Sequence, residues 1–362
     1  MPKRMATASE SNPESDRYGD TPHPRSVSDF FGHTAALRTL QLAHATKRFP
    51  QALIISGPPG IGKATLAWRL ARFFLAQPGA PENQALGNFF VPQDHPVARQ
   101  ITAMSHPDLI LLRREWNERD RKFFADIRVE DVRRAVHLFQ QAAGGGGYRI
   151  CVIDNADDLN ANSANALLKL IEEPPPCSLF LITATLPGRM LATLRSRCQR
   201  IFLKPLAPSE ISAIILSLKR PPETESELEA AANHAEGSVH KALRLLVRES
   251  AALDLHLRKI LDDLPRIDWQ EIHALASRLA ATPAQDDFEA MLGSIKDWLG
   301  LRTRQSAKAM PSGSAAALAP YALVWEKLTE ATRELEIFNL DKRLFILNLF
   351  SDLAAAARPQ VD

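Results

Sequence analysis

The sequence contains few cysteines and has little net charge, and each shortage excludes a class of protein. Its 362 residues include only Cys151, Cys177 and Cys198, and no two of them form a Cys-x-x-Cys pair. Neither a disulfide framework nor a cysteine zinc site is therefore expected. The formal net charge of +2 is too small to indicate a nucleic-acid or membrane surface by itself. Any contact with DNA must come from a local patch or through a partner.

Long apolar runs are also missing. No uninterrupted apolar stretch reaches the roughly 18 residues that a membrane span needs, while the composition of 45% hydrophobic and 24% charged residues is typical of a water-soluble globular protein. The N-terminal residues lack the apolar core of a signal peptide and are rich in Ser and Pro, so we predict a disordered tail over residues 1–28. The cytoplasm is the expected compartment.

Short apolar runs alternate with amphipathic stretches over residues 29–206. This pattern predicts an α/β domain in which helices cover a parallel sheet. The clearest strands are expected at Ala52–Ser56, Arg149–Ile153 and residues 179–183, which are short and apolar like buried parallel strands. The stretch 78–99, rich in Pro, Gly, Asn and Gln, predicts a loop or insertion, and the glycines at 144–147 predict a flexible turn.

The spacing of apolar residues becomes helical after residue 206. Ile272, Leu275 and Leu279 recur three or four positions apart, as do Leu344 and Leu347, which is typical of helices that pack on helices. Proline and glycine interrupt this pattern at several points. We therefore predict a small helical domain over residues 207–252 and a larger all-helical domain over residues 253–362.

A glycine-rich segment between the first expected strand and the next helix matches a phosphate loop. Glycines allow backbone N–H groups to turn toward phosphate oxygens, and the helix that follows presents its positive end to the same anion. The lysine supplies a charge for the outer phosphates. The predicted nucleotide site consists of Gly57, Pro58, Pro59, Gly60, Ile61, Gly62 and Lys63, followed by Ala64 and Thr65.

The residue after the lysine departs from the motif. A hydroxyl is needed there to hold Mg²⁺, but the residue is Ala64. Thr65 comes one position too late, about 100° around the helix. Because the backbone cradle remains, we expect ATP or ADP to bind weakly, with Mg²⁺ present only when nucleotide is bound.

Asp154 follows the second expected strand, at the edge where parallel sheets bind ligands. It is therefore the candidate partner for Mg²⁺ or its water, and the alternative is a structural carboxylate that caps a turn. The next residue, Asn155, is neutral and cannot act as the base that activates water. Ala64 and Asn155 together argue against metal-assisted hydrolysis at this site.

The segment NSANALLKLIEEPP at 162–175, the strand after it and residues 191–198 resemble the AAA+ subunits of the bacterial DNA polymerase III clamp loader. The triplet Ser196-Arg197-Cys198 matches the arginine-finger motif of that family. With the phosphate loop, the resemblance covers residues 30–206. It implies an AAA+ phosphate-loop domain with a parallel sheet, a helical lid over 207–252 and an all-helical collar over 253–362 that joins partner subunits.

Within that family the chain most resembles the delta-prime type of subunit. Relatives that hydrolyse ATP carry a glutamate at the position of Asn155 and the sensor 2 arginine at the position of His240, and the sensor 1 position is open among Thr183, Ala184 and Thr185. The resemblance implies a subunit that does not hydrolyse ATP on its own and donates Arg197 to the ATP site of a neighbouring subunit.

The resemblance also implies partners. These are the motor ATPase and delta subunits, the sliding clamp, and primed DNA reached through the complex, as part of the DNA polymerase III holoenzyme. Many relatives carry a four-cysteine zinc module between the phosphate loop and the second strand, but residues 78–129 contain no cysteine. We expect no zinc.

Alternatives remain open at three further points. The nearly complete phosphate loop with Lys63 also fits an active AAA+ ATPase, either the motor subunit of the loader or another ATPase of DNA metabolism. Arg197 would alternatively form a solvated basic edge with nearby arginines. Further arginines on the helix expected to begin near residue 129 are candidates for DNA contact, and the alternative for them is a solvated helix face. They are Arg128, Arg133 and Arg134.

Overall fold

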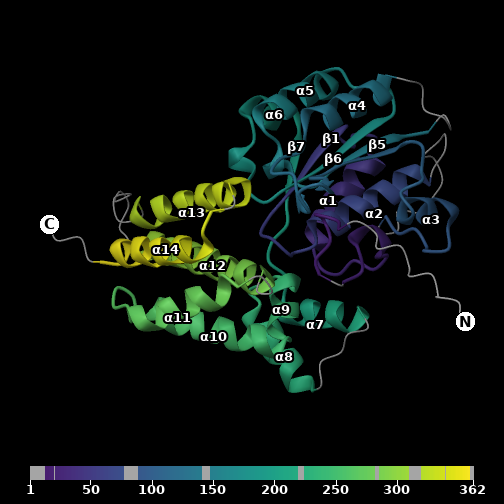
Figure 1. The fold of residues 1–362 in the computed structure, drawn as a ribbon. Coiled ribbons are helices and arrows are strands. Elements are labelled where there is room, and N and C mark those ends of the chain that lie inside the picture. The colour runs from purple at the N-terminus through teal and green to yellow at the C-terminus, as the bar shows by residue number, and fades with distance from the viewer. Residues whose placement is uncertain are drawn as a thin grey trace, which may run out of the picture. The chain divides into compact units, whose positions relative to one another are not determined.

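The structure, a computed structural model, describes residues 13–19, 21–76, 89–140, 147–218, 224–281, 285–309, 319–338 and 340–358. The chain divides into two compact units, residues 1–242 and 243–362. The first contains the sheet, and the second is built from helices (Figure 1). No helix in the described ranges is long and apolar enough to cross a membrane.

A five-stranded parallel sheet with the order β2-β5-β6-β1-β7 forms the centre of the first unit. Two of the expected strands, β1 (Ala52–Ser56) and β5 (Arg149–Ile153), are confirmed, and β6 (Ser178–Ala184) is longer by one residue at each end. The edge strands β2 (Leu109–Leu112) and β7 (Gln199–Phe202) were not predicted. The central strands are buried on both faces, which explains their continuous apolar runs.

Helices cover both faces of the sheet, which confirms the predicted α/β class (Figure 1). Successive residues of β1 point to opposite faces, so that Leu53 and Ile55 enter one core while Ile54 enters the other. Trp68 and Phe74 fill the first core. The first core is covered by α1 (Thr34–Ala45), α2 (Lys63–Leu75) and α3 (Pro96–Thr102), and the second by α4 (Val129–Gln140), α5 (Ala161–Glu172) and α6 (Ala192–Arg197).

The expectation of a disordered tail over residues 1–28 is wrong for residues 13–19 and 21–28, which we call the N-terminal strap. Glu14 Oε1 lies 2.9 Å from Arg113 Nη2, and Asp16 pairs with both Arg113 and His23. Composition cannot reveal the contacts with Arg113 because that residue lies about a hundred positions away in the sequence. Residues 1–12 and 20 lie outside the described residues.

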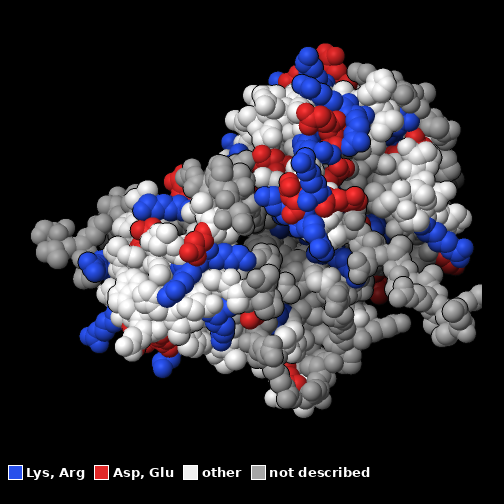
Figure 2. Space-filling model, viewed as in Figure 1, with Lys and Arg blue, Asp and Glu red and all other residues white. Residues whose placement is uncertain are grey.

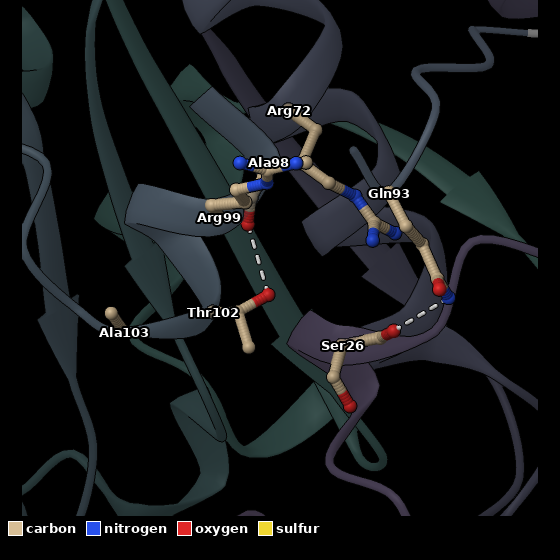
Figure 3. A pocket seen from close by; sticks show the side chains of 7 residues that line it. All are labelled: Ser26, Arg72, Gln93, Ala98, Arg99, Thr102 and Ala103. Carbon is tan, nitrogen blue, oxygen red and sulfur yellow. Dashed lines mark hydrogen bonds between the residues drawn. The ribbon is translucent and has the colours of Figure 1, made fainter. Parts of the chain in front are cut away.

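Two buried arginines of α2 anchor the strap. Arg69 Nη1 donates to the carbonyl of Ser28 (2.7 Å), and Arg72 donates to the carbonyls of Val27 and Arg25. Burial, together with the nearby charge of Arg69, lowers the pKa of Arg72 to about 10. Arg72 also lines a cavity of about 370 Å³ with Ser26, Gln93, Ala98, Arg99, Thr102 and Ala103 (Figure 3).

The stretch predicted as a loop at 78–99 contains the beginning of a helix. Residues 77–88 lie outside the described residues, but α3 begins at Pro96, and the side chain of His95 accepts from Val97 N (3.2 Å). Proline suits the first position of a helix because it has no N–H to leave unsatisfied. In the predicted turn at 144–147, only residue 147 is described.

The helices that follow β7 are divided between the two units. The first unit includes α7 (Pro208–Ser217) and α8 (Glu225–His234), and α9 (Val239–Leu245) crosses residue 242. The boundary predicted at residue 252 falls inside α10 (Arg248–Asp262). No proline or glycine occurs between Gly237 and Pro265, so the sequence carries no breaker that would mark where α10 begins.

The second unit packs its helices around one apolar core. Ile272, Leu275 and Leu279 are buried as predicted, whereas Leu344 is exposed. One polar cluster lies inside this unit, where Asp254 accepts from Ser294 Oγ (2.6 Å) and from Arg258 Nε (2.9 Å). Its helices after α10 are α11 (Trp269–Leu279), α12 (Gln285–Ala309), α13 (Ala319–Phe338) and α14 (Lys342–Ala356).

The three cysteines are free thiols. Cys151 lies in β5, Cys198 follows α6, and both are buried, whereas Cys177 is exposed in the turn before β6. Burial raises the pKa of Cys198 to about 11. The two buried thiols are therefore protonated and unreactive at neutral pH.

We predict that Gly237→Ala lowers the free energy of unfolding by about 2 to 4 kcal/mol. Gly237 has φ +84°, and an added Cβ would overlap Pro205 and approach Leu206 N to 2.7 Å. Chemical denaturation would measure the change. Gly188→Ala is the matched control because open space surrounds Gly188, and it should change stability by less than about 0.5 kcal/mol. Equal stability of the two variants would contradict the prediction.

Candidate functional site

The phosphate loop connects β1 to α2 and depends on its glycines. Gly57, Gly60 and Gly62 have φ values of +148°, +74° and +98°. Residues that carry a Cβ rarely adopt such values. A Cβ at Gly57 would also lie 2.5 Å from the carbonyl oxygen of Leu203. Gly62 is the N-cap of α2 and offers no side-chain cap, so the positive end of this helix faces the loop uncapped.

Every carbonyl from Gly57 to Ile61 takes part in a hydrogen bond. Lys63 Nζ donates to Gly57 O (2.9 Å) and Pro58 O (2.8 Å). The other carbonyls bind groups from the start of α1 and the start of α9. These contacts are Ser238 Oγ to Pro59 O (3.0 Å), Val239 N to Gly60 O (2.9 Å) and His33 Nε2 with Ile61 O (2.8 Å).

Lys63 and Asp154 both have shifted pKa values because both are withdrawn from water. Burial lowers the pKa of Lys63 to about 8, against the opposing attraction of Asp154 and Asp157. Burial also raises the pKa of Asp154 to about 6, although a hydrogen bond from Thr183 Oγ (2.5 Å) favours its charged form. Thr183, one of three candidates for the sensor 1 position, is thus the one that contacts Asp154.

The donor set at this site fits phosphate better than it fits a metal ion. The loop glycines and the uncapped start of α2 suit a phosphate, but Ala64 offers no oxygen to Mg²⁺. Asn155 Oδ1 accepts from Asp157 N (3.4 Å) and caps a short turn. Within the described ranges, no three His, Cys, Asp or Glu side chains gather where they could hold a metal ion.

The strap reaches the start of α9. The ring of Tyr18 stacks on that of His240, with 4.1 Å between centroids and 10° between planes. His240 occupies the position where relatives that hydrolyse ATP are expected to carry the sensor 2 arginine. Ser15 Oγ also donates to the carbonyl of Arg114 (2.8 Å), so the strap links the end of β2 to α9.

Arg197 is the last residue of α6, and its side chain is 41% exposed. Its Nε lies 2.8 Å from Glu172 Oε1, and its Nη1 donates to the carbonyl of Thr193 (3.0 Å). Arg195, on the same helix, instead donates to the carbonyl of Pro187 (3.2 Å). Both guanidinium groups thus bind a backbone carbonyl, and of the two it is Arg197 that also pairs with a carboxylate at the surface.

Of the three arginines considered for DNA contact, Arg133 and Arg134 lie on α4 and Arg128 comes directly before it, and two of the three pair with acidic side chains. Arg128 pairs with Asp131 (3.0 Å) and Glu115 (2.5 Å), and Arg134 pairs with the same two carboxylates. On the face of the first unit seen in Figure 2, Lys and Arg alternate with Asp and Glu rather than forming a patch of one sign. These pairs support the alternative of a charged, solvated helix face.

Sequence reasoning missed four residues of this region. His33 and Tyr18 carry no motif, and Ser238 stands two residues before the sensor 2 position at His240; the partners of all three lie far away in the sequence. Glu172 stood within the quoted EEPP motif, but its pairing with Arg197 requires α5 and α6 to be packed together. The motifs around Glu172 and His240 offered a signal in advance, but neither gave the contact partner.

Comparison with known proteins gave consistent matches. Residues 32–207 match the family described as DNA polymerase III, delta subunit. The delta' subunit of DNA polymerase III from Pseudomonas aeruginosa is 30% identical over 251 residues, which cover 68% of each chain. Its counterpart from Escherichia coli is 28% identical over 242 residues, covering 65% of this chain and 66% of that protein. The matched part spans about two thirds of each relative.

We predict that Asp154→Asn raises the free energy of unfolding by about 1 to 2 kcal/mol at pH 7.5. Asparagine can still accept from Thr183 but carries no charge to withdraw from water. Because the folded-state pKa of Asp154 is raised from 3.8 to about 6, the wild type bears this penalty above pH 6 and loses it as the pH falls toward 4.

The advantage of Asp154→Asn should therefore shrink over the same pH interval. Urea denaturation at pH 7.5, 6 and 4.5 would measure it. A loss of stability at pH 7.5 would show instead that attraction between Asp154 and Lys63 outweighs the cost of burial.

Proposed function

The chain belongs to the delta-prime family of DNA polymerase III clamp-loader subunits, and on that premise we propose that it activates ATP hydrolysis in a neighbouring subunit without hydrolysing ATP itself. The observation that carries the proposal is a contrast within one chain. An exposed arginine stands at the end of α6 in the family's finger triplet, whereas the chain's own phosphate loop lacks the hydroxyl that binds Mg²⁺.

The proposed role of Arg197 follows from the chemistry of phosphoryl transfer. Negative charge spreads over the phosphoryl oxygens in the transition state, and a guanidinium stabilises it by charge-assisted hydrogen bonds. Arginine is the residue for this task because it stays charged and has a fork of donors that matches phosphate. An arginine side chain at the surface can reach the phosphates of a nucleotide that is bound by the adjacent subunit.

The chain's own phosphate loop supports at most weak nucleotide binding. Lys63 donates to Gly57 and Pro58 and would have to leave these carbonyls to reach a phosphate. A bound ATP or ADP would supply the anion that the cradle suits, with backbone N–H groups, the start of α2 and Lys63 holding it. With Ala64 and Asn155 at the positions for the metal and the base, we propose that the nucleotide is not turned over.

We further propose the partners that the family implies. These are the motor ATPase and delta subunits, the sliding clamp and, through the complex, primed DNA in the cytoplasm. The helical unit at residues 243–362 would provide the collar that holds the subunits together. We propose no zinc site and no polymerase activity for this chain.

A second candidate function is an active AAA+ ATPase, the motor subunit of the loader or a related enzyme. The observation that favours it is the loop itself, because its three glycines keep the positive φ values of a phosphate cradle and Lys63 follows them. Ala64, Asn155 and His240 weigh against it.

In the reconstituted loader with clamp and primed DNA, Arg197→Ala should lower the steady-state rate of ATP hydrolysis by about tenfold or more, because an arginine finger contributes about 10³-fold at the site it serves. Arg195→Ala is the control, since that arginine lies on the same helix outside the finger triplet and binds the carbonyls of Pro187 and Gly188, and it should change the rate less than about twofold. A wild-type rate with Arg197→Ala would disprove the trans-acting role.

The isolated chain should show no ATP turnover above background. Ala64, which follows the loop lysine, has no hydroxyl to bind Mg²⁺, and Asn155, which follows Asp154 after β5, cannot act as a base. A coupled phosphate-release assay would test this, with Lys63→Ala as the reference for contaminating activity. Turnover by the wild type that disappears in Lys63→Ala would establish the motor ATPase instead.

A further inference from the structure

Glu172 binds the side chain on which the proposed function rests. It is the last residue of α5, and its Oε1 lies 2.8 Å from Arg197 Nε. The carbonyl of Thr193 accepts from Nη1 of the same guanidinium at 3.0 Å. Two of the five N–H groups of Arg197 are thereby engaged, and no described residue binds Nη2.

Glu172 occupies an unfavourable place for a carboxylate. The C-terminus of a helix carries partial negative charge, so an acidic side chain there costs about 0.3 to 1 kcal/mol. The ion pair with Arg197 stabilises the fold little. The side chains of Glu172 and Arg197 are 39% and 41% exposed, and exposed ion pairs contribute about 0 to 1 kcal/mol. Fold stability therefore does not account for a glutamate at this position.

The neighbouring residues show that the pairing is selective. Glu173, the next residue and the C-cap of α5, is also exposed, yet no ion pair with a described residue involves it. On the other helix, Arg195 turns to the carbonyls of Pro187 and Gly188 rather than to Glu172. Of the two adjacent acids and two nearby arginines, only Glu172 and Arg197 meet.

We propose that Glu172 is the positioning residue of the Arg197 finger. The proposal rests on the proposed function and adds the device that presents the guanidinium. A free arginine side chain samples many rotamers and must lose this freedom when it binds phosphate. Contacts at Nε and Nη1 fix the plane of the guanidinium in advance, and its unbound Nη2 hydrogens are left for a phosphoryl group of the neighbouring subunit.

In the reconstituted loader, Glu172→Ala should lower kcat for ATP hydrolysis about tenfold, because a mispositioned group acts on the transition state. The KM for ATP should change less than about twofold, since the finger does not build the neighbour's binding pocket. Glu172→Gln keeps an oxygen that can accept from Nε, and it should restore most of kcat. Glu173→Ala is the matched control and should behave as the wild type.

The Arg197→Ala background separates the outcomes. If Glu172 acts through the finger, adding Glu172→Ala to Arg197→Ala has no further effect on kcat. An equal loss of kcat in both backgrounds would overturn the positioning role. So would a wild-type kcat for Glu172→Ala beside a slow Arg197→Ala loader. A wild-type rate for Arg197→Ala would instead refute the proposed function itself.

Discussion

Hydrogen bonds to five consecutive carbonyls of the phosphate loop hold together parts of the first unit that lie far apart in the sequence. They join Lys63 of α2, His33 at the start of α1, and Ser238 and Val239 at the start of α9. Since the carbonyls face these partners, the path of the loop and the position of α9 are set together. A change at either place must be accommodated at the other.

The sequence predicted the centre of the fold better than its periphery. The runs that became β1, β5 and β6 are apolar on both faces, so their pattern required no knowledge of neighbours. The edge strand β7 is mostly exposed, and its four residues, two polar followed by two apolar, show no alternation that would identify a strand. The strap was missed because Glu14 and Asp16 look like solvated charges until Arg113 lies beside them.

The candidate site divides in the same way. The residues of the phosphate loop could be predicted because backbone geometry demands glycine at fixed spacing, and the finger triplet because it stands in a motif. The contacts of Tyr18 with His240 and of Glu172 with Arg197 could not, since each joins elements brought together only by folding. Local chemistry can thus be predicted from spacing, whereas the support of that chemistry depends on tertiary packing.

The uneven exposure of the three thiols has a practical consequence. Cys151 and Cys198 are buried, and Cys177 alone is exposed, in the turn that follows α5 and its terminal Glu172. A thiol-reactive fluorophore would therefore attach to the unmodified chain at one defined place, a few residues from the end of α5. Its emission would report the approach of another subunit to this edge without any engineered cysteine.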